Sequence, residues 1–117
     1  MDSAQLRKLL GLVGLGVRGR GAIVGVQQVR EAARRGKLHL AIAAKDASGN
    51  SLDKVLPLLK ARGIPVFVGP DAAELGSAAG RETVAVIGIV DNGLAKGIRA
   101  LSPDLMPDIR VDRGERV

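Results

Sequence analysis

The stretch Leu-His-Leu-Ala-Ile-Ala-Ala at residues 38–44 decides the fold. It is an apolar run of strand length without alternating polar positions, which is typical of a strand covered on both faces. Residues 84–90 form a second apolar run, rich in β-branched side chains, and residues 64–68 form a shorter one. A sheet covered on both faces needs a layer of helices on each side, so we expect an α/β fold.

Segments with helical periodicity lie around and between these runs. Apolar residues spaced at i, i+3, i+4, i+7 and i+11 from Leu6 to Val17 predict an amphipathic first helix. Pro57 predicts a kink or a broken first turn inside the third helix. The later helices are predicted from their boundary residues, which are Gly25 to Gly36, Ser51 to Gly63, Asp71 to Gly80, and Asp91 or Asn92 to Leu101.

The chain of 117 residues has the length of one domain, which we place at residues 1–101. Residues 102–117 contain two prolines and mixed charges without periodicity, so we expect a loose tail there. The absence of cysteine excludes disulfides, thiolate metal sites and cysteine nucleophiles. Phe67 is the single aromatic residue, which excludes an aromatic platform for stacking single-stranded bases.

The first segment imitates a secretion signal, because Arg7 and Lys8 precede an apolar stretch. No small-x-small cleavage site follows that stretch, and its apolar positions have helical spacing. No run approaches the roughly 20 apolar residues that span a bilayer. We therefore expect a cytoplasmic protein without a membrane partner.

Positive charge is concentrated in the first third of the chain. Residues 1–37 hold eight basic and two acidic residues, whereas residues 38–117 hold ten of each, so the net charge of +6 originates in the first third. If these cations share a face, their field attracts a polyanion, and binding weakens with salt. The alternative is a solvated face that keeps the protein soluble.

The sequence holds no arrangement that predicts catalysis or metal binding. The glycines from Gly14 to Gly19 match the dinucleotide-binding pattern, but a segment with helical periodicity precedes them where that motif needs a strand. His39 is the one histidine and lies in the apolar run, so we interpret it as a partly buried structural residue. We expect no catalytic residue, no metal, no cofactor and no enzymatic activity.

The most informative polar pattern is Gly-Val-Gln-Gln-Val-Arg at residues 25–30, a predicted helix start just beyond a basic loop. The N-terminus of a helix directs unpaired backbone N–H groups and a positive dipole outward, which suits a phosphate. Side-chain amides both donate and accept hydrogen bonds, and so can read the edges of purine bases. An ordinary polar helix face is the alternative interpretation.

These residues, together with segments before and after them, resemble the bacterial YlxQ-type proteins of the ribosomal protein L-seven-Ae/L-thirty-e superfamily. The resemblance covers about residues 6–101, with its elements in the same order, and includes Glu-Leu-Gly-Ser-Ala-Ala-Gly-Arg-Glu at residues 74–82. Its other segments are residues 9–12, 18–21, 24–29, 37–38, 43–48, 63–66 and 87–96.

The resemblance implies a three-layer α/β/α sandwich around a small mixed sheet, in a monomer that binds ribosomal or other structured RNA. Archetypal members bind kink-turn RNA, in which a Gly-x-Asn-Glu helix start reads sheared G·A pairs and two loops cover a flipped-out nucleotide. Carried over by position, the helix start corresponds to Gly25 with Gln27 and Gln28. The first covering loop, at the end of a strand, corresponds to Lys45 with Asp46. The second covering loop corresponds to Arg81 with Glu82 and Thr83.

The chain departs from the family pattern at several of these positions. Glutamines replace the Asn-Glu pair, Glu31 replaces a helix lysine, and Ser77 replaces the lysine of the Leu-Gly-Lys motif. The alternative function is therefore a protein-interaction module that keeps the fold but has lost RNA readout. For RNA binding, we expect a cationic rim gathered around the amide pair at one end of the sandwich, formed by Arg18, Arg20, Arg30, Arg34 and Arg35.

Overall fold

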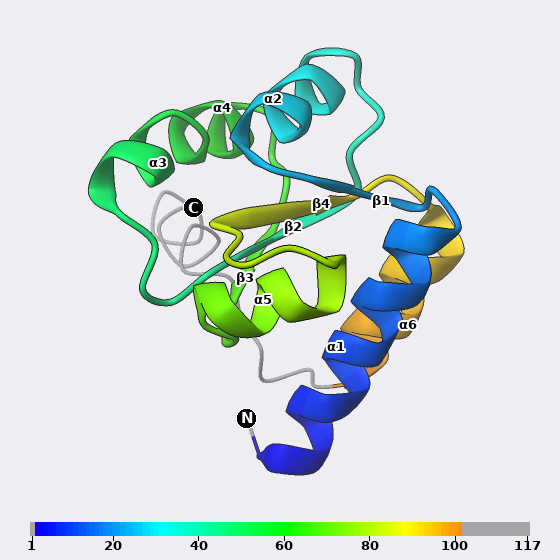
Figure 1. Cartoon of the computed structure of the whole chain (residues 1–117). Helices are drawn as coiled ribbons and strands as arrows, with labels where there is room; N and C mark the ends of the chain where they lie inside the picture. Colours follow the sequence, from blue (N-terminus) through cyan, green and yellow to red (C-terminus); the bar gives the residue numbers. More distant parts are fainter. Residues whose placement is uncertain (1, 102–117) are drawn as a thin grey trace.

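Helices and strands alternate along the chain in the computed structural model, which describes residues 2–101 (Figure 1). The expected tail at residues 102–117 lies outside this described part. The strands are β1 (Ala22–Val24), β2 (Leu40–Ala43), β3 (Val66–Val68) and β4 (Val86–Ile89). The helices are α1 (Ser3–Arg18), α2 (Val26–Arg34), α3 (Gly49–Asp53), α4 (Leu56–Ala61), α5 (Ala72–Ala79) and α6 (Asn92–Leu101).

The strands form one mixed sheet in the order β1–β4–β2–β3. Both β1 and β2 pair antiparallel with β4, whereas β2 and β3 are parallel. Consequently β1, β2 and β3 all end where β4 begins. Backbone hydrogen bonds close this end: Gly25 N–H donates to the Val86 carbonyl at 2.9 Å, and Ala44 N–H to the Ala85 carbonyl at 2.8 Å. The loops after three strands therefore meet the loop before the fourth.

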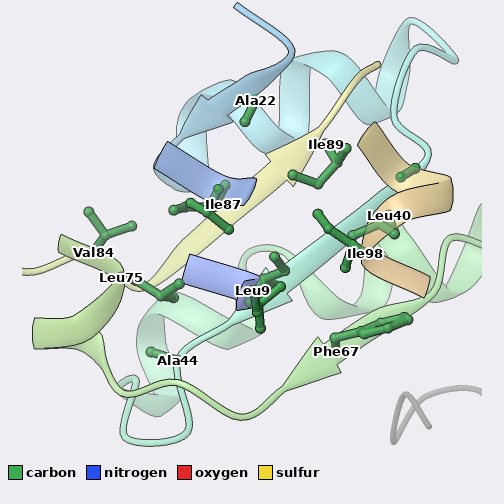
Figure 2. Packing of buried hydrophobic residues seen from close by; sticks show 13 residues of the cluster. Leu9, Ala22, Leu40, Ala44, Phe67, Leu75, Val84, Ile87, Ile89 and Ile98 are labelled. Carbon is green, nitrogen blue, oxygen red and sulfur yellow. The ribbon is translucent and has the colours of Figure 1, made fainter. Parts of the chain in front are cut away.

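Helices cover both faces of the sheet, which confirms the three-layer sandwich. One face packs on α1, α5 and α6, and the other packs on α2 and α4 (Figure 1). On the first face, Leu9 of α1, Leu75 of α5 and Ile98 of α6 surround apolar side chains of β2 and β4 (Figure 2). Residues of β2 are buried at every position, because alternate side chains enter the two different cores.

The glycines of the first segment serve helix packing. Gly14 and Gly16 are buried within α1. A Cβ at Gly14 would lie 3.3 Å from the carbonyl oxygen of Ala78 in α5, and a Cβ at Gly16 would lie 3.0 Å from the Ala22 side chain. Small residues let α1 approach these neighbours closely. The dinucleotide-binding pattern is therefore part of a helix and does not form a strand-to-helix turn.

Two local features differ from the sequence prediction. The short strand β1 is not predicted, because three apolar residues between glycines do not establish a period of two. The predicted helix start at Ser51 is wrong: α3 begins at Gly49, and Ser48 caps it with a hydroxyl that accepts from Ser51 N–H at 3.1 Å. The predicted interruption at Pro57 is confirmed, because the segment divides into α3 and α4 with proline in the first turn of α4.

None of the helices within residues 2–101 combines the length and the apolar character that crossing a bilayer requires.

Candidate nucleic-acid interface

Helix α2 begins directly after β1, and Gly25 makes the turn between them. Its φ of 100° and ψ of 159° define a backbone conformation that is strained for any residue with a Cβ. No side chain caps the first turn of α2, and a Cβ at Gly25 would meet no atom within 4 Å. The N–H groups of this helix start therefore have no side-chain cap, and the backbone turn at Gly25 leaves its own Cβ position open, which suits a phosphate-binding turn.

Gln27 and Gln28 lie in the first turn of α2 with both side chains exposed. Neither amide takes part in a hydrogen bond within residues 2–101. Val29, which follows them, is fully buried against the sheet and fixes the rotation of the helix. Two amides are thus held outward on a rigid element and remain available to a ligand.

The loop after β2 lies at the same end of the sheet. Lys45 N–H donates to the Pro70 carbonyl at 2.9 Å, which ties this loop to the segment that follows β3. The carboxylate of Asp46 accepts from Ala72 N–H at 2.8 Å, in the first turn of α5. Asp46 therefore has a structural bond, whereas the exposed ammonium group of Lys45 is free to meet a ligand.

The loop before β4 completes this end of the molecule. Gly80 ends α5 in the left-handed conformation at φ 74°, and exposed Arg81, Glu82 and Thr83 lead back to β4. Gly76 allows this return, because a Cβ there would lie 2.5 Å from the carbonyl oxygen of Glu82. We name the resulting surface the amide end, formed by Gly25, Gln27, Gln28, Lys45, Asp46, Arg81, Glu82 and Thr83.

Carboxylates outnumber cations around the amide end. Its loops and the start of α5 carry two cations and four carboxylates, namely Lys45, Arg81, Asp46, Asp71, Glu74 and Glu82. Three of the four carboxylates accept backbone hydrogen bonds at the start of α5. They stabilise the helix start, so their orientation is fixed by the fold.

Three members of the expected cationic rim, Arg20, Arg34 and Arg35, lie away from the amide pair. Arg20 precedes β1, and the carbonyl of neighbouring Gly21 accepts from Val90 N–H at 2.9 Å, just beyond the end of β4. Arg34 is the last residue of α2 and Arg35 follows it, also away from the helix start. Arg18 ends α1, and its guanidinium folds back beside Gly14. The strand directions place Arg20, Arg34 and Arg35 at the other end of the sheet. The Arg18 guanidinium instead lies beside the last turn of α5, because the Gly14 Cβ position is 3.3 Å from both Arg18 Nη1 and the Ala78 carbonyl oxygen.

Arg30 lies between the two groups, one turn after Gln27. Its side chain is half-buried, and its Nε is buried without a hydrogen-bond partner within the described residues. Arg30 is therefore the only member of the expected rim near the amide pair, and part of its guanidinium is enclosed by the protein. No group of three or more His, Asp or Glu side chains within residues 2–101 is suited to holding a metal ion.

Comparison with known proteins identifies the family of this chain. Residues 7–98 match the Ribosomal protein L7Ae/L30e/S12e/Gadd45 family. The chain belongs to this family. Within the family fold, the amide end consists of the helix start after β1 and the loops beside it, where the sequence resemblance placed the readout residues. No functionally curated protein matches the chain.

Two solved structures are similar in fold to this chain. A Bacillus halodurans protein of unknown function is 35% identical with a TM-score of 0.74, over 80% of this chain and 95% of that chain. The Giardia lamblia 15.5kD RNA binding protein is 20% identical with a TM-score of 0.75, over 90% of each chain. At that identity the second similarity shows the shared fold alone.

Sequence reasoning missed two cations that the fold brings beside the arginines of α2. Arg62 follows α4 and donates from Nη1 to the Arg34 carbonyl at 3.3 Å. Arg99 of α6 donates from Nη2 to the His39 carbonyl at 3.2 Å. Both occupy helix C-terminal positions, which is a weak sequence signal, and only the sheet topology brings them next to α2 and β2.

Proposed function

We propose that this protein binds structured RNA, without a catalytic role, through the amide end. The observation that carries the proposal is the uncapped first turn of α2, where Gln27 and Gln28 are exposed above the open turn at Gly25. We also propose that the chain is a cytoplasmic, monomeric YlxQ-type member of its family that associates with ribosomes or their assembly. The RNA shape we propose is kink-turn-like, with accessible guanine edges.

Each part of the amide end has a physical role in this proposal. The backbone N–H groups of α2 bind a phosphate, because they lack partners and lie at the positive end of the helix dipole. Gln27 and Gln28 donate to and accept from base edges, which provides discrimination between sequences. Lys45 and Arg81 hold the backbone on either side. The absence of a side chain at Gly25 leaves room for the RNA to approach.

The similarity to the Giardia RNA binding protein supports this proposal, as does membership of a family described by ribosomal proteins. The departures from the family pattern affect affinity more than geometry. Gln27 keeps amide chemistry at the first readout position on a side chain one methylene longer, and Gln28 replaces the carboxylate of the second position with an amide. Glu31 adds a negative charge one turn further along α2.

The test compares two RNA hairpins, one with tandem G·A pairs and one with Watson–Crick pairs in their place. We expect the protein to prefer the first, and Gln27→Ala and Gln28→Ala each to reduce that preference about 5- to 150-fold, since a good base contact contributes about 1–3 kcal/mol of discrimination. Ser3→Ala, an exposed substitution at the far end of α1, is the control and should bind like the wild type. Equal binding of both hairpins by wild type and variants would contradict readout by the amide end.

A protein-interaction module of the same fold is the second candidate function. The excess of carboxylates around the amide end favours it, because fixed negative charge opposes a phosphate backbone. Under this alternative, neither hairpin binds at near-physiological salt, and the intact protein instead retains a protein partner that Gln28→Ala or Arg81→Ala releases.

A further inference from the structure

Cations gather at the end of the sheet opposite the amide end. They come from the connection before β1, the C-terminal end of α2, the connection that follows it, the end of α4 and the last turn of α6. We name this surface the arginine end, formed by Arg20, Arg34, Arg35, Lys37, Arg62 and Arg99. All six residues are exposed.

Hydrogen bonds link the elements that carry these cations. Arg62 bonds to the Arg34 carbonyl and Arg99 to the His39 carbonyl, while His39 N–H donates to the Ile89 carbonyl at 2.8 Å at the end of β4. These bonds join α4 to the end of α2 and α6 to the start of β2. Arg62 and Arg99 therefore do not belong to separate flexible segments.

Negative charge at the arginine end is already engaged. Within residues 2–101 its carboxylates are Glu31, which pairs with Arg35 at 3.2 Å, and Asp91, which accepts from Leu94 N–H at 2.8 Å as the cap of α6. The side chains of Arg20, Arg34 and Lys37 form no hydrogen bond or ion pair within the part of the chain that the structure describes. Several cations thus remain available to an external anion.

The backbone conformation at Arg20 indicates that this arginine has a role other than stabilising the fold. Arg20 is the one non-glycine residue within 2–101 that has a positive φ, at 65°. It follows Gly19, the C-cap of α1, at a position where helices commonly use glycine. Glycine would adopt this conformation without strain, so the arginine side chain opposes stability where it stands.

A groove connects the two ends along the outer side of α2. It has a volume of about 250 Å³ and is lined by Ile23, Gln28, Glu31, Ala32, Arg35, Lys37 and Val90. Gln28 belongs to the amide end, whereas Arg35 and Lys37 belong to the arginine end. Arg35 comes seven residues after Gln28, which is a helical rise of about 10 Å along the axis. A single extended strand can therefore contact both ends.

We propose that the arginine end is a second phosphate-binding surface, which holds RNA backbone that continues beyond the segment bound at the amide end. The proposal rests on RNA binding by this protein, but not on base readout by Gln27 and Gln28. Phosphate contacts of this kind add affinity and orientation without sequence preference, and they make binding depend on salt.

The experiment uses the full chain and two RNA hairpins with tandem G·A pairs, one short and one extended by a duplex arm. The test variants are Arg20→Gly, the double variant Arg34→Gln with Lys37→Gln, and Gln28→Ala. The control is Arg7→Gln, which removes one positive charge from α1, outside both surfaces. Affinity is measured over a range of salt concentrations, and melting temperature is measured for every variant.

We expect the extended hairpin to bind more tightly than the short one and with a steeper salt dependence. Arg20→Gly should reduce the slope of log K against log salt by about 0.7 to 1, and the double variant by about twice that amount. Arg20→Gly should also melt a few degrees higher, about 4 °C, because glycine relieves the backbone strain. Lost affinity in a more stable protein cannot result from unfolding.

Equal binding of the two hairpins, or wild-type slopes in both arginine-end variants, would overturn the second surface. If those variants are unchanged while Gln28→Ala loses preference for G·A pairs, the arginine end fails and the proposed readout stands. If only the arginine-end variants lose affinity, the second surface stands and the readout fails. If the protein binds neither hairpin, both proposals are overturned.

Discussion

The carboxylate of Glu31 in α2 accepts a hydrogen bond at 3.2 Å from Nε of Arg35, the C-cap of the same helix four residues later. Both residues line the groove that joins Gln28 to Lys37. The pair is exposed, with 63% of the Arg35 side chain and 57% of the Glu31 side chain accessible, so it contributes little to stability. Its main electrostatic effect is to neutralise one cation of the arginine end.

Glu31→Gln should strengthen RNA binding, because it removes a negative charge from the groove and frees Arg35 for phosphate. We expect about a 2- to 5-fold gain in affinity at low salt, and a loss of no more than about 0.5 kcal/mol in the free energy of unfolding. The measurement is an RNA titration beside urea denaturation. Asp53→Asn removes an equal charge from exposed α3, and a gain no larger than that of this control would show that the pair does not oppose RNA.

Gly25→Ala should destabilise the protein although open space surrounds the position. The φ of 100° is strained for alanine, so we expect a loss of about 1–3 kcal/mol in the free energy of unfolding. Gly49→Ala is the matched control, since Gly49 is the first residue of α3 with no atom within 4 Å of its Cβ position and no positive φ. That control should leave stability unchanged or raise it slightly. Equal stability of the two variants would contradict the conformation assigned to Gly25.

Much of the fold can be predicted because its signals are local. The helix predicted to begin at Asp71 does begin there, with Asp71 as its N-cap, and the Asp71 and Glu74 side chains form a capping box, with hydrogen bonds of 2.7 Å and 2.9 Å to each other's backbone N–H. The apolar run at residues 38–44 contains a strand buried at every position, as the absence of alternation indicates. Caps and apolar runs are specified by neighbouring residues, so one sequence suffices to locate them.

The position of the cations could not be predicted, because it depends on strand direction. Arg20 and Gly25 are only five residues apart, but the three residues of β1 between them place one before the strand and the other after it. Arg62 and Arg34 are 28 residues apart and share a hydrogen bond. A count of charge along the sequence does not contain this information. The helix start with Gln27 and Gln28 could be singled out from the residues, whereas the two loops of the amide end could be anticipated only from family resemblance.

Gly76→Ala should displace the loop that carries Arg81, Glu82 and Thr83. A Cβ at Gly76 would lie 2.5 to 2.8 Å from backbone atoms of Glu82 and Thr83, and backbone cannot give way as a flexible side chain can. We expect a loss of about 1–3 kcal/mol in the free energy of unfolding, together with weaker RNA binding. Ser77→Ala, the exposed neighbour in the same helix, should change neither property by a measurable amount. Wild-type stability of Gly76→Ala would show that this loop does not pack closely on α5.

Arg30→Met should make the folded protein more stable. The Nε of Arg30 is buried without a hydrogen-bond partner within residues 2–101, and such a group opposes folding by about 1–3 kcal/mol. Methionine retains the length and the apolar contacts of the arginine stem but has no buried N–H, so we expect a gain of about 1 kcal/mol in urea denaturation. Arg7→Met, at an exposed position of α1, is the control for loss of charge and should change stability by less than about 0.5 kcal/mol. Because Arg30 lies one turn from Gln27, the same variant should bind RNA more weakly if its guanidinium reaches a phosphate. A variant that is less stable than the wild type would show that the Nε of Arg30 has a partner in the folded protein.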